Sequence, residues 1–128
     1  MIHINELRIG NLFDFYDEIK PVIALDSYHD RIAYGLNEDS GYFWCYLDEA
    51  FPIPLTDRWM IKFGKRKKND ISDNYILKLG LEIVKGEEGW EMLLGKDEII
   101  VATIQYVHQL QNLYFALMGE ELKLVHKV

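Results

Sequence analysis

The sequence predicts an α+β fold in which antiparallel sheets form most of the structure and helices are few. Short segments rich in β-branched and aromatic residues recur at intervals of about ten residues, with polar or glycine-containing turns between them. The chain holds 8 Tyr, 6 Phe and 3 Trp, which is typical of sheets that bury large side chains in a small core. Two segments have the apolar spacing of a helix.

The first lobe is expected to be an SH3-like, small antiparallel β-barrel formed by residues 1–55. Its predicted strands lie at residues 7–13, 19–25, 31–37 and 41–47. Pro21 cannot donate a backbone hydrogen bond, so it should lie near a strand start or on a sheet edge. The segment LRIGNLF is similar to the first strand of SH3-like modules, and this fold analogy implies no function.

The second lobe is expected over residues 56–128, and the two lobes should form one compact unit. Thr56 is a predicted N-cap and Gly64 a predicted C-terminal residue of a short helix. Residues 74–104 predict a second antiparallel sheet, because glycine-containing turns separate its apolar segments. A helix over residues 105–118 is expected to pack across that sheet. Its buried face should contain Tyr106, Leu110, Leu113, Tyr114 and Leu117.

The segment from Ile99 to Gly119 has no Asp, Glu, Lys or Arg and is nominally long enough to cross a bilayer. Polar side chains at its centre insert poorly into lipid, so a membrane span is not expected. These side chains are Gln105, His108, Gln109, Gln111 and Asn112. They either satisfy backbone groups of the sheet or lie against a partner or a second copy. The first interpretation is favoured, because apolar stripes usually face a core.

Charge and cysteine content limit the function classes. The net charge is −7, and residues 1–55 carry all of the excess, with ten acidic and three basic residues. Phosphates would be repelled by a nucleic-acid-binding face there. Cys45 is the single cysteine, so no intrachain disulfide can form. Glu6 and Arg8 interrupt any apolar signal segment, and a cytoplasmic location is therefore expected.

No catalytic, cofactor-binding or metal-binding residue is predicted. The four histidines, at positions 3, 29, 108 and 126, form no pair with metal-ligand spacing. Asp26, His29 and Asp30 form either a weak cation site, an acid–base pair or a solvated turn, and the turn is favoured. The chain contains no P-loop, dinucleotide fingerprint or nucleophile elbow.

Two surfaces are candidates for interaction. Tyr42, Trp44 and Tyr46 alternate along one predicted strand and so share a face. An exposed face would stack bases or line a peptide groove, but burial of both strand faces is the favoured interpretation. The second candidate is a basic loop of five residues, Lys62, Lys65, Arg66, Lys67 and Lys68. It either contacts phosphates or is a solvated loop after a helix C-terminus, and the loop is favoured.

Three segments resemble a family of uncharacterised small proteins from gut bacteria and their phages or mobile elements. They are ELRIGNL near the start, PIPLTDRWMIKFG in the middle and YVHQLQNLYFALMGEEL near the end. In that family a segment like IPLTxxWLxKFGF precedes a variable hairpin region, and one like VHQLQNLYFALTGEEL closes the chain. Met118 stands where the family usually has Thr. The resemblance implies a phage-related or mobile-element context and carries over no activity, cofactor or catalytic residue.

The favoured function is therefore a non-catalytic interaction module that binds another protein, with neither a membrane nor a cofactor involved. One alternative is nucleic-acid binding through residues 62–68. Another is a small enzyme with a site between the two lobes, although no catalytic constellation supports it. The sequence leaves the oligomeric state open.

Overall fold

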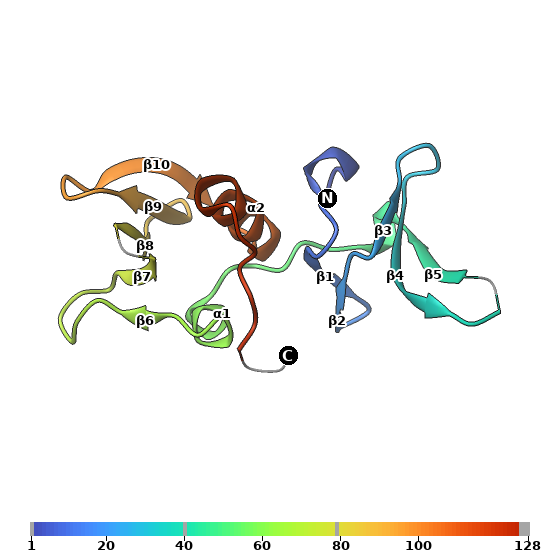
Figure 1. Cartoon of the computed structure of the whole chain (residues 1–128), viewed down its shortest axis with the longest axis horizontal. Coiled ribbons are helices and arrows are strands. Elements are labelled where there is room, and N and C mark those ends of the chain that lie inside the picture. The colour runs from blue at the N-terminus through green and yellow to red at the C-terminus, as the bar shows by residue number, and fades with distance from the viewer. Residues whose placement is uncertain (1, 40, 79, 126–128) are drawn as a thin grey trace. The chain divides into compact units, whose positions relative to one another are not determined.

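A computed structural model describes residues 2–39, 41–78 and 80–125. Its contacts divide the chain into unit 1, Met1–Pro54 with Tyr106–Glu120, and unit 2, Leu55–Gln105 with Glu121–Val128. Along the sequence, the segment Leu55–Gln105 of unit 2 is thus inserted between the two segments of unit 1. Helices are few and the sheets are antiparallel, which confirms the predicted α+β class (Figure 1).

Unit 1 contains two separate sheets. Its elements are η1 (Ile4–Glu6), β1 (Leu12–Phe15), β2 (Glu18–Pro21), β3 (Ala24–Asp26), β4 (Arg31–Asn37), β5 (Gly41–Tyr46), η2 (Leu47–Glu49) and α2 (Val107–Met118). β1 and β2 form a hairpin, and β3, β4 and β5 form a sheet in that order. The described strands are not closed into the barrel that the SH3-like prediction requires. Pro21 ends β2, where it cannot donate to a further ladder bond.

The first strand also begins later than predicted. Gly10 has a φ of 98°, and the Asn11 N–H donates to the Arg8 carbonyl at 3.0 Å, so the chain turns before β1 begins. Tyr16 and Asp17 join β1 to β2, and both have positive φ, as in the type I′ turns that suit two-residue hairpins. The predicted strand over 7–13 therefore gives way to a turn followed by a hairpin.

The core of unit 1 lies on one face of the β3–β4–β5 sheet. Ile32 and Cys45 are direct neighbours on β4 and β5, and both side chains are buried. They belong to a cluster with Ile2, Leu7, Phe13, Val22 and Ala50. Since successive side chains on a strand point to opposite faces, the neighbours of Cys45 on β5 must point away from this core.

Helix α2 belongs to unit 1, whereas the sequence placed it in the second lobe. Its buried side chains also differ from the predicted set. Leu110 and Tyr114 are buried as expected, but Tyr106 and Leu113 are half-buried and Leu117 is exposed. The remaining buried residues of the helix are Val107, His108 and Gln111. The helix therefore buries a mixed face that includes part of its polar stripe.

The polar stripe of α2 is hydrogen-bonded to the turn before β1. The Gln111 Oε1 accepts a 2.9 Å bond from the Leu12 N–H, and its Nε2 donates to the Gly10 carbonyl at 3.1 Å. A buried amide is tolerated when it satisfies backbone groups in this way. These bonds explain why the helix belongs with the N-terminal segment.

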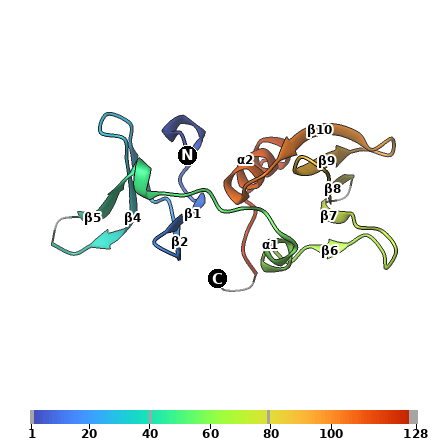
Figure 2. The same ribbon diagram turned by 180° about the vertical axis from the view of Figure 1, so that it is seen from behind.

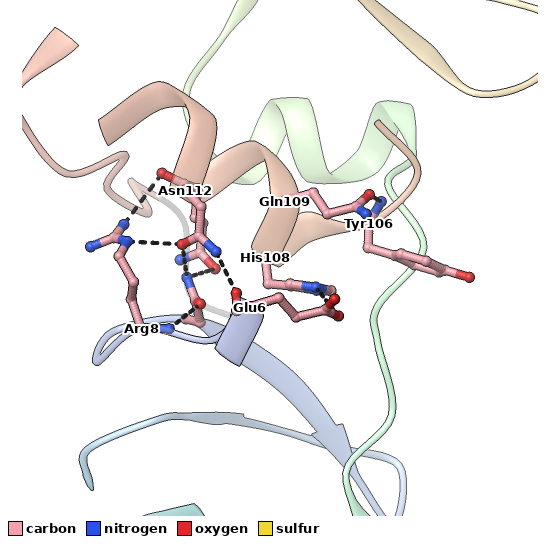
Figure 3. Close-up of polar contacts among 8 residues, drawn as sticks. Glu6, Arg8, Tyr106, His108, Gln109 and Asn112 are labelled. Carbon is pink, nitrogen blue, oxygen red and sulfur yellow. Dashed lines mark hydrogen bonds and ion pairs between the residues drawn. The ribbon is translucent and has the colours of Figure 1, made fainter. Parts of the chain in front are cut away.

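Asn112 and His108 continue this contact on the same helix (Figure 3). The Asn112 Oδ1 accepts from the Arg8 Nε at 2.9 Å, and its Nδ2 donates to the Glu6 carbonyl at 2.8 Å. The His108 Nε2 lies 3.2 Å from the Glu6 Oε1. We call Gln111, Asn112 and the imidazole of His108 together the amide row. The residues to which they bond lie about one hundred positions earlier in the sequence.

Unit 2 contains a short helix and one five-stranded sheet. Its elements are α1 (Asp57–Lys62), β6 (Arg66–Lys67), β7 (Tyr75–Lys78), β8 (Leu81–Lys85), β9 (Trp90–Leu94) and β10 (Ile99–Ile104). The strand order is β10-β9-β8-β7-β6. The predicted short helix and second sheet are confirmed, and Thr56 is the N-cap residue. The sequence did not predict β6, which lies inside the basic loop.

Polar groups on two aromatic side chains fix the core of unit 2. The Trp90 Nε1 donates to the Leu55 carbonyl at 2.9 Å, and the Tyr75 hydroxyl donates to the Asp57 carboxylate at 2.9 Å. Burial, together with that bond, raises the pKa of Tyr75 to about 12. Buried aromatic groups usually find such partners, and here they tie the sheet to residues around α1.

Candidate functional site

The outer face of β5 carries the aromatic side chains that the sequence singled out. Tyr42 is 40 % exposed, Tyr46 is 61 % exposed and Trp44 is half-buried. Cys45, between the last two, points into the core. We call Tyr42, Trp44 and Tyr46 the aromatic face. The favoured interpretation, in which both faces of this strand are buried, is therefore wrong for Tyr42 and Tyr46.

The strand register extends the aromatic face across the sheet. Tyr46 lies opposite Arg31 on β4, which in turn lies opposite Asp26 on β3. Directly opposed residues share a face, so these side chains are on the outer side together. Leu36, opposite Tyr42, is also exposed. Figure 1 shows the three strands, Figure 2 shows β4 and β5 from behind, and β5 is at the end of the strand order.

Arg31 contacts both Trp44 and Asp26 on this outer side. Its guanidinium carbon lies 4.3 Å from the centroid of the Trp44 ring, and its Nε donates to the Asp26 Oδ2 at 2.8 Å. On the other side, Tyr42 contacts Trp44 edge to face, with centroids 5.6 Å apart. Cation–π and edge-to-face contacts restrict ring rotation, so the indole is held in place before any partner arrives.

Asp26 holds Arg31 in turn. Its carboxylate accepts from the Arg31 Nε, from the His29 Nδ1 at 2.9 Å and from the His29 N–H at 3.2 Å. The bonds from Arg31 and His29 lower the pKa of Asp26 to about 2. The carboxylate is therefore ionised at neutral pH and compensates the Arg31 charge. The predicted solvated turn at Asp26, His29 and Asp30 thus also orients the arginine on Trp44.

A hollow of about 310 Å³ lies at the end of β5, and Asp30, Tyr46, Leu47 and Asp48 line it. Its two carboxylates and one phenol ring suit a positive charge. Nearby, both oxygens of Glu49 are occupied, one by the Tyr46 N–H at 2.9 Å and one by the Tyr16 hydroxyl at 2.9 Å. Glu49 therefore fixes the last residue of β5 and the wall of the hollow.

Sequence reasoning missed two contributors to this surface, Arg31 and Leu36, whereas Phe43 lies on the opposite face of β5, with Cys45. Phe43 is 46 % exposed and stacks against Tyr34, with centroids 6.0 Å apart. An irregularity in β4 between Ala33 and Gly35 shifts the pairing there. Simple alternation would place Leu36 on the face of the buried Ile32, so the shifted register explains its position opposite Tyr42. The register also places Arg31 near Trp44.

Two of the five basic-loop residues, Lys67 and Lys68, have acidic partners in unit 2. The Lys68 Nζ lies 3.3 Å from Glu82 and 3.7 Å from Glu98. The Lys67 Nζ lies 3.8 Å from Asp73. Hydrogen bonds from Asn74 and Lys68 lower the pKa of Glu82 against the opposing effect of burial. These lysines are therefore compensated within the unit rather than presented to phosphate.

The other three bases of the loop contact different parts of unit 2. The Lys65 Nζ donates to the Leu77 carbonyl at 2.9 Å, and the Lys62 Nζ lies 4.6 Å from the centroid of the Trp59 ring. Arg66 is exposed in β6, where it pairs with Ile76 on β7. The five bases therefore have different contacts within the unit.

A metal site and a nucleophile place requirements on the possible metal ligands and on the single thiol. Among them, no three His, Cys, Asp and Glu side chains are grouped so that they could hold a metal ion. Burial raises the pKa of the Cys45 thiol to about 11, so it is a poor nucleophile. His126 lies outside the described residues.

The two units differ in net charge. Unit 1 holds eleven acidic and three basic residues, a net charge of −8, and unit 2 holds ten acidic and eleven basic residues, a net charge of +1. The two add to the −7 of the whole chain. The aromatic face therefore lies in the strongly acidic unit.

Comparison of the chain with models of protein families, with curated proteins and with solved structures gave no match. Among the helices of the described residues, none is long and apolar enough to cross a membrane.

Proposed function

We propose that the chain is a non-catalytic interaction module that binds another protein through the outer side of the β3–β4–β5 sheet. The observation that carries this proposal is the exposure of Tyr42 and Tyr46 beside a Trp44 ring that Arg31 covers. Exposed aromatic side chains on a sheet mark interaction sites more often than isolated apolar residues do. The resemblance of the three sequence segments adds a phage-related or mobile-element context to the proposal.

The residue types on this surface support protein binding. Trp, Tyr and Arg are the side chains that most often dominate the binding energy of protein interfaces. Here the contacts of Trp44 with Arg31 and Tyr42 already restrict its rotamers. A side chain that is ordered before binding loses less entropy when the partner arrives, so more of its contact energy contributes to affinity.

Nucleic-acid binding is the weaker alternative. Lys67 and Lys68 face acidic partners within unit 2, and the aromatic face lies in a unit of net charge −8. A polyanion approaching that face would be repelled at low ionic strength. These charges favour a protein as the partner.

The test is an affinity capture from a lysate of the source organism, half of it treated with nuclease. Wild type is compared with Trp44→Ala/Tyr46→Ala and with a control, Ile61→Ala/Ile71→Ala, which removes two exposed side chains of unit 2. We expect a protein that survives nuclease, binds wild type and control equally, and is lost with the aromatic-face variant. A partner released by nuclease, or one retained by that variant, would contradict the proposal.

A further inference from the structure

The edge of β5 that faces away from β4 has no paired strand among the described residues. β5 is the last strand in the order β3-β4-β5, and the segment Gly41–Tyr46 contains neither a charged residue nor a proline. Natural edge strands are commonly protected by lysine, proline or a covering segment, because an open edge can pair with another strand. On β5 the Glu49 carboxylate covers the Tyr46 N–H, and the stretch of edge at Trp44 is suited to accept a strand.

The hydrogen-bond pattern shows which backbone groups face this edge. The Leu47 N–H donates to the Asp30 carbonyl at 2.9 Å, and Tyr46 lies opposite Arg31. In an antiparallel pair, residues that exchange backbone bonds alternate with residues that do not. The N–H and C=O of Cys45 therefore face β4, and those of Trp44 face the open edge. A strand added there would bond to the residue whose ring is fixed on the aromatic face.

The acidic residues near this edge favour an added strand that carries positive charge. Asp30 and Asp48 line the hollow beside the Tyr46 ring, and among the described residues neither carboxylate has an ion pair. The unit as a whole carries a net charge of −8. An acidic segment would be repelled, and so would the same edge of a second copy of the chain.

We propose that the partner contributes an extended segment rich in lysine or arginine, which adds to the open edge of β5 and places one cationic side chain in the hollow lined by Asp30, Tyr46 and Asp48. The inference rests on the proposed function and names its partner chemistry. The added strand supplies backbone bonds at Trp44. The cation gains the Tyr46 ring and two carboxylates. Alternate side chains of the segment meet the aromatic face, because side chains alternate along a strand.

The test is a selection of displayed random dodecapeptides on the immobilised full-length chain. It is run in parallel on wild type, Asp30→Asn/Asp48→Asn and Trp44→Ala/Tyr46→Ala. We expect wild type to enrich peptides with lysine or arginine at alternating positions and few acidic residues. For the best such peptide, the Asp30→Asn/Asp48→Asn variant should lose about fivefold or more in affinity at low salt. The loss should shrink as salt is raised.

The outcomes separate the two proposals. Peptides that require Trp44 and Tyr46 but carry no basic excess would overturn this inference and leave the proposed function standing. No enrichment of wild type over the aromatic-face variant would overturn both. Binding of one selected peptide is then mapped by amide chemical shifts in labelled protein. Strand addition predicts protection of the Trp44 amide from solvent exchange, and unchanged exchange there would contradict the strand-addition mode.

Discussion

Strand β5 and helix α2 are both free of charged side chains, yet they use their side chains in opposite ways. On β5, Tyr42 and Tyr46 are exposed to solvent. On α2, His108 and Gln111 are buried. By composition alone, the aromatic strand would belong inside and the row of amides outside.

The difference shows that burial follows the available partners more than side-chain polarity. The inner side of β5 already has Cys45 against Ile32, so the alternate residues must face outward. The Gln111 side chain is buried because a backbone N–H and a carbonyl of the N-terminal turn bond to it. An uncharged segment can therefore form an interface, or it can hold two parts of one unit together. We call the bonds of the amide row to the N-terminal segment the clamp.

The strongest test of the clamp is Gln111→Leu. The substitution keeps the volume close to that of the amide but leaves the buried Leu12 N–H without its acceptor, at a cost of about 2–4 kcal/mol of unfolding free energy. Urea unfolding measures this loss. Gln105→Leu is the control, because it removes an exposed amide bonded to the Glu88 carbonyl and should change stability by less than about 0.5 kcal/mol. Equal stability of the two variants would show that the amide row does not anchor the helix.

The two sides of β5 can be compared through Cys45. Its thiol is buried and burial raises its pKa to about 11, so little thiolate exists at pH 8 and reagent access is blocked. We expect a disulfide reagent to label folded protein about a hundredfold or more slowly than protein unfolded in urea. Fast labelling of the folded chain would mean that the inner side of the strand is open as well.

His108 makes the clamp sensitive to acid. Burial lowers the pKa of His108 below its ordinary value of 6.5, although Glu6 opposes the effect. Between the folded and unfolded pKa values the unfolded chain binds a proton that the folded chain does not. Stability is therefore complete above pH 6.5 and declines as pH falls below it, by at most about 1.4 kcal/mol per pH unit. Denaturation midpoints of wild type and His108→Gln between about pH 7.5 and pH 5.5 measure this slope, which should be smaller in the variant. Equal slopes would assign the pH dependence to other groups.

The smallest effect on stability is expected at the aromatic face. Tyr46→Ala removes a side chain that is 61 % exposed, so the unfolding free energy should change by less than about 1 kcal/mol. Binding of the captured partner should nevertheless weaken strongly, since interface aromatics often contribute most of the affinity. Calorimetry for stability and titration for binding separate the two. A large loss of stability would mean that the face is structural.

The sequence was most informative where structure is local. Alternation placed β4 and β5, and Thr56 and Gly64 marked the ends of the short helix, because caps and strand periods depend on neighbouring residues. Helix α2 was assigned to the wrong lobe by the sequence, since Leu12 and Gln111 are 99 positions apart and no local pattern links them. The candidate site followed the same rule. Strand alternation grouped the aromatic face, whereas Arg31 required the register of β4 against β5.

The insertion of the segment Leu55–Gln105 between the two segments of unit 1 has a consequence for synthesis. The chain leaves unit 1 at Pro54 and returns at Tyr106, and these two residues form a β-bridge. A ribosome therefore delivers the whole inserted sheet before it delivers the helix that completes the N-terminal unit. Until then, the Gly10 carbonyl and the Leu12 N–H lack the Gln111 side chain to which they bond in the folded chain. The segment of the protein that is made first thus completes its hydrogen bonds only after residues 55–105 have been made.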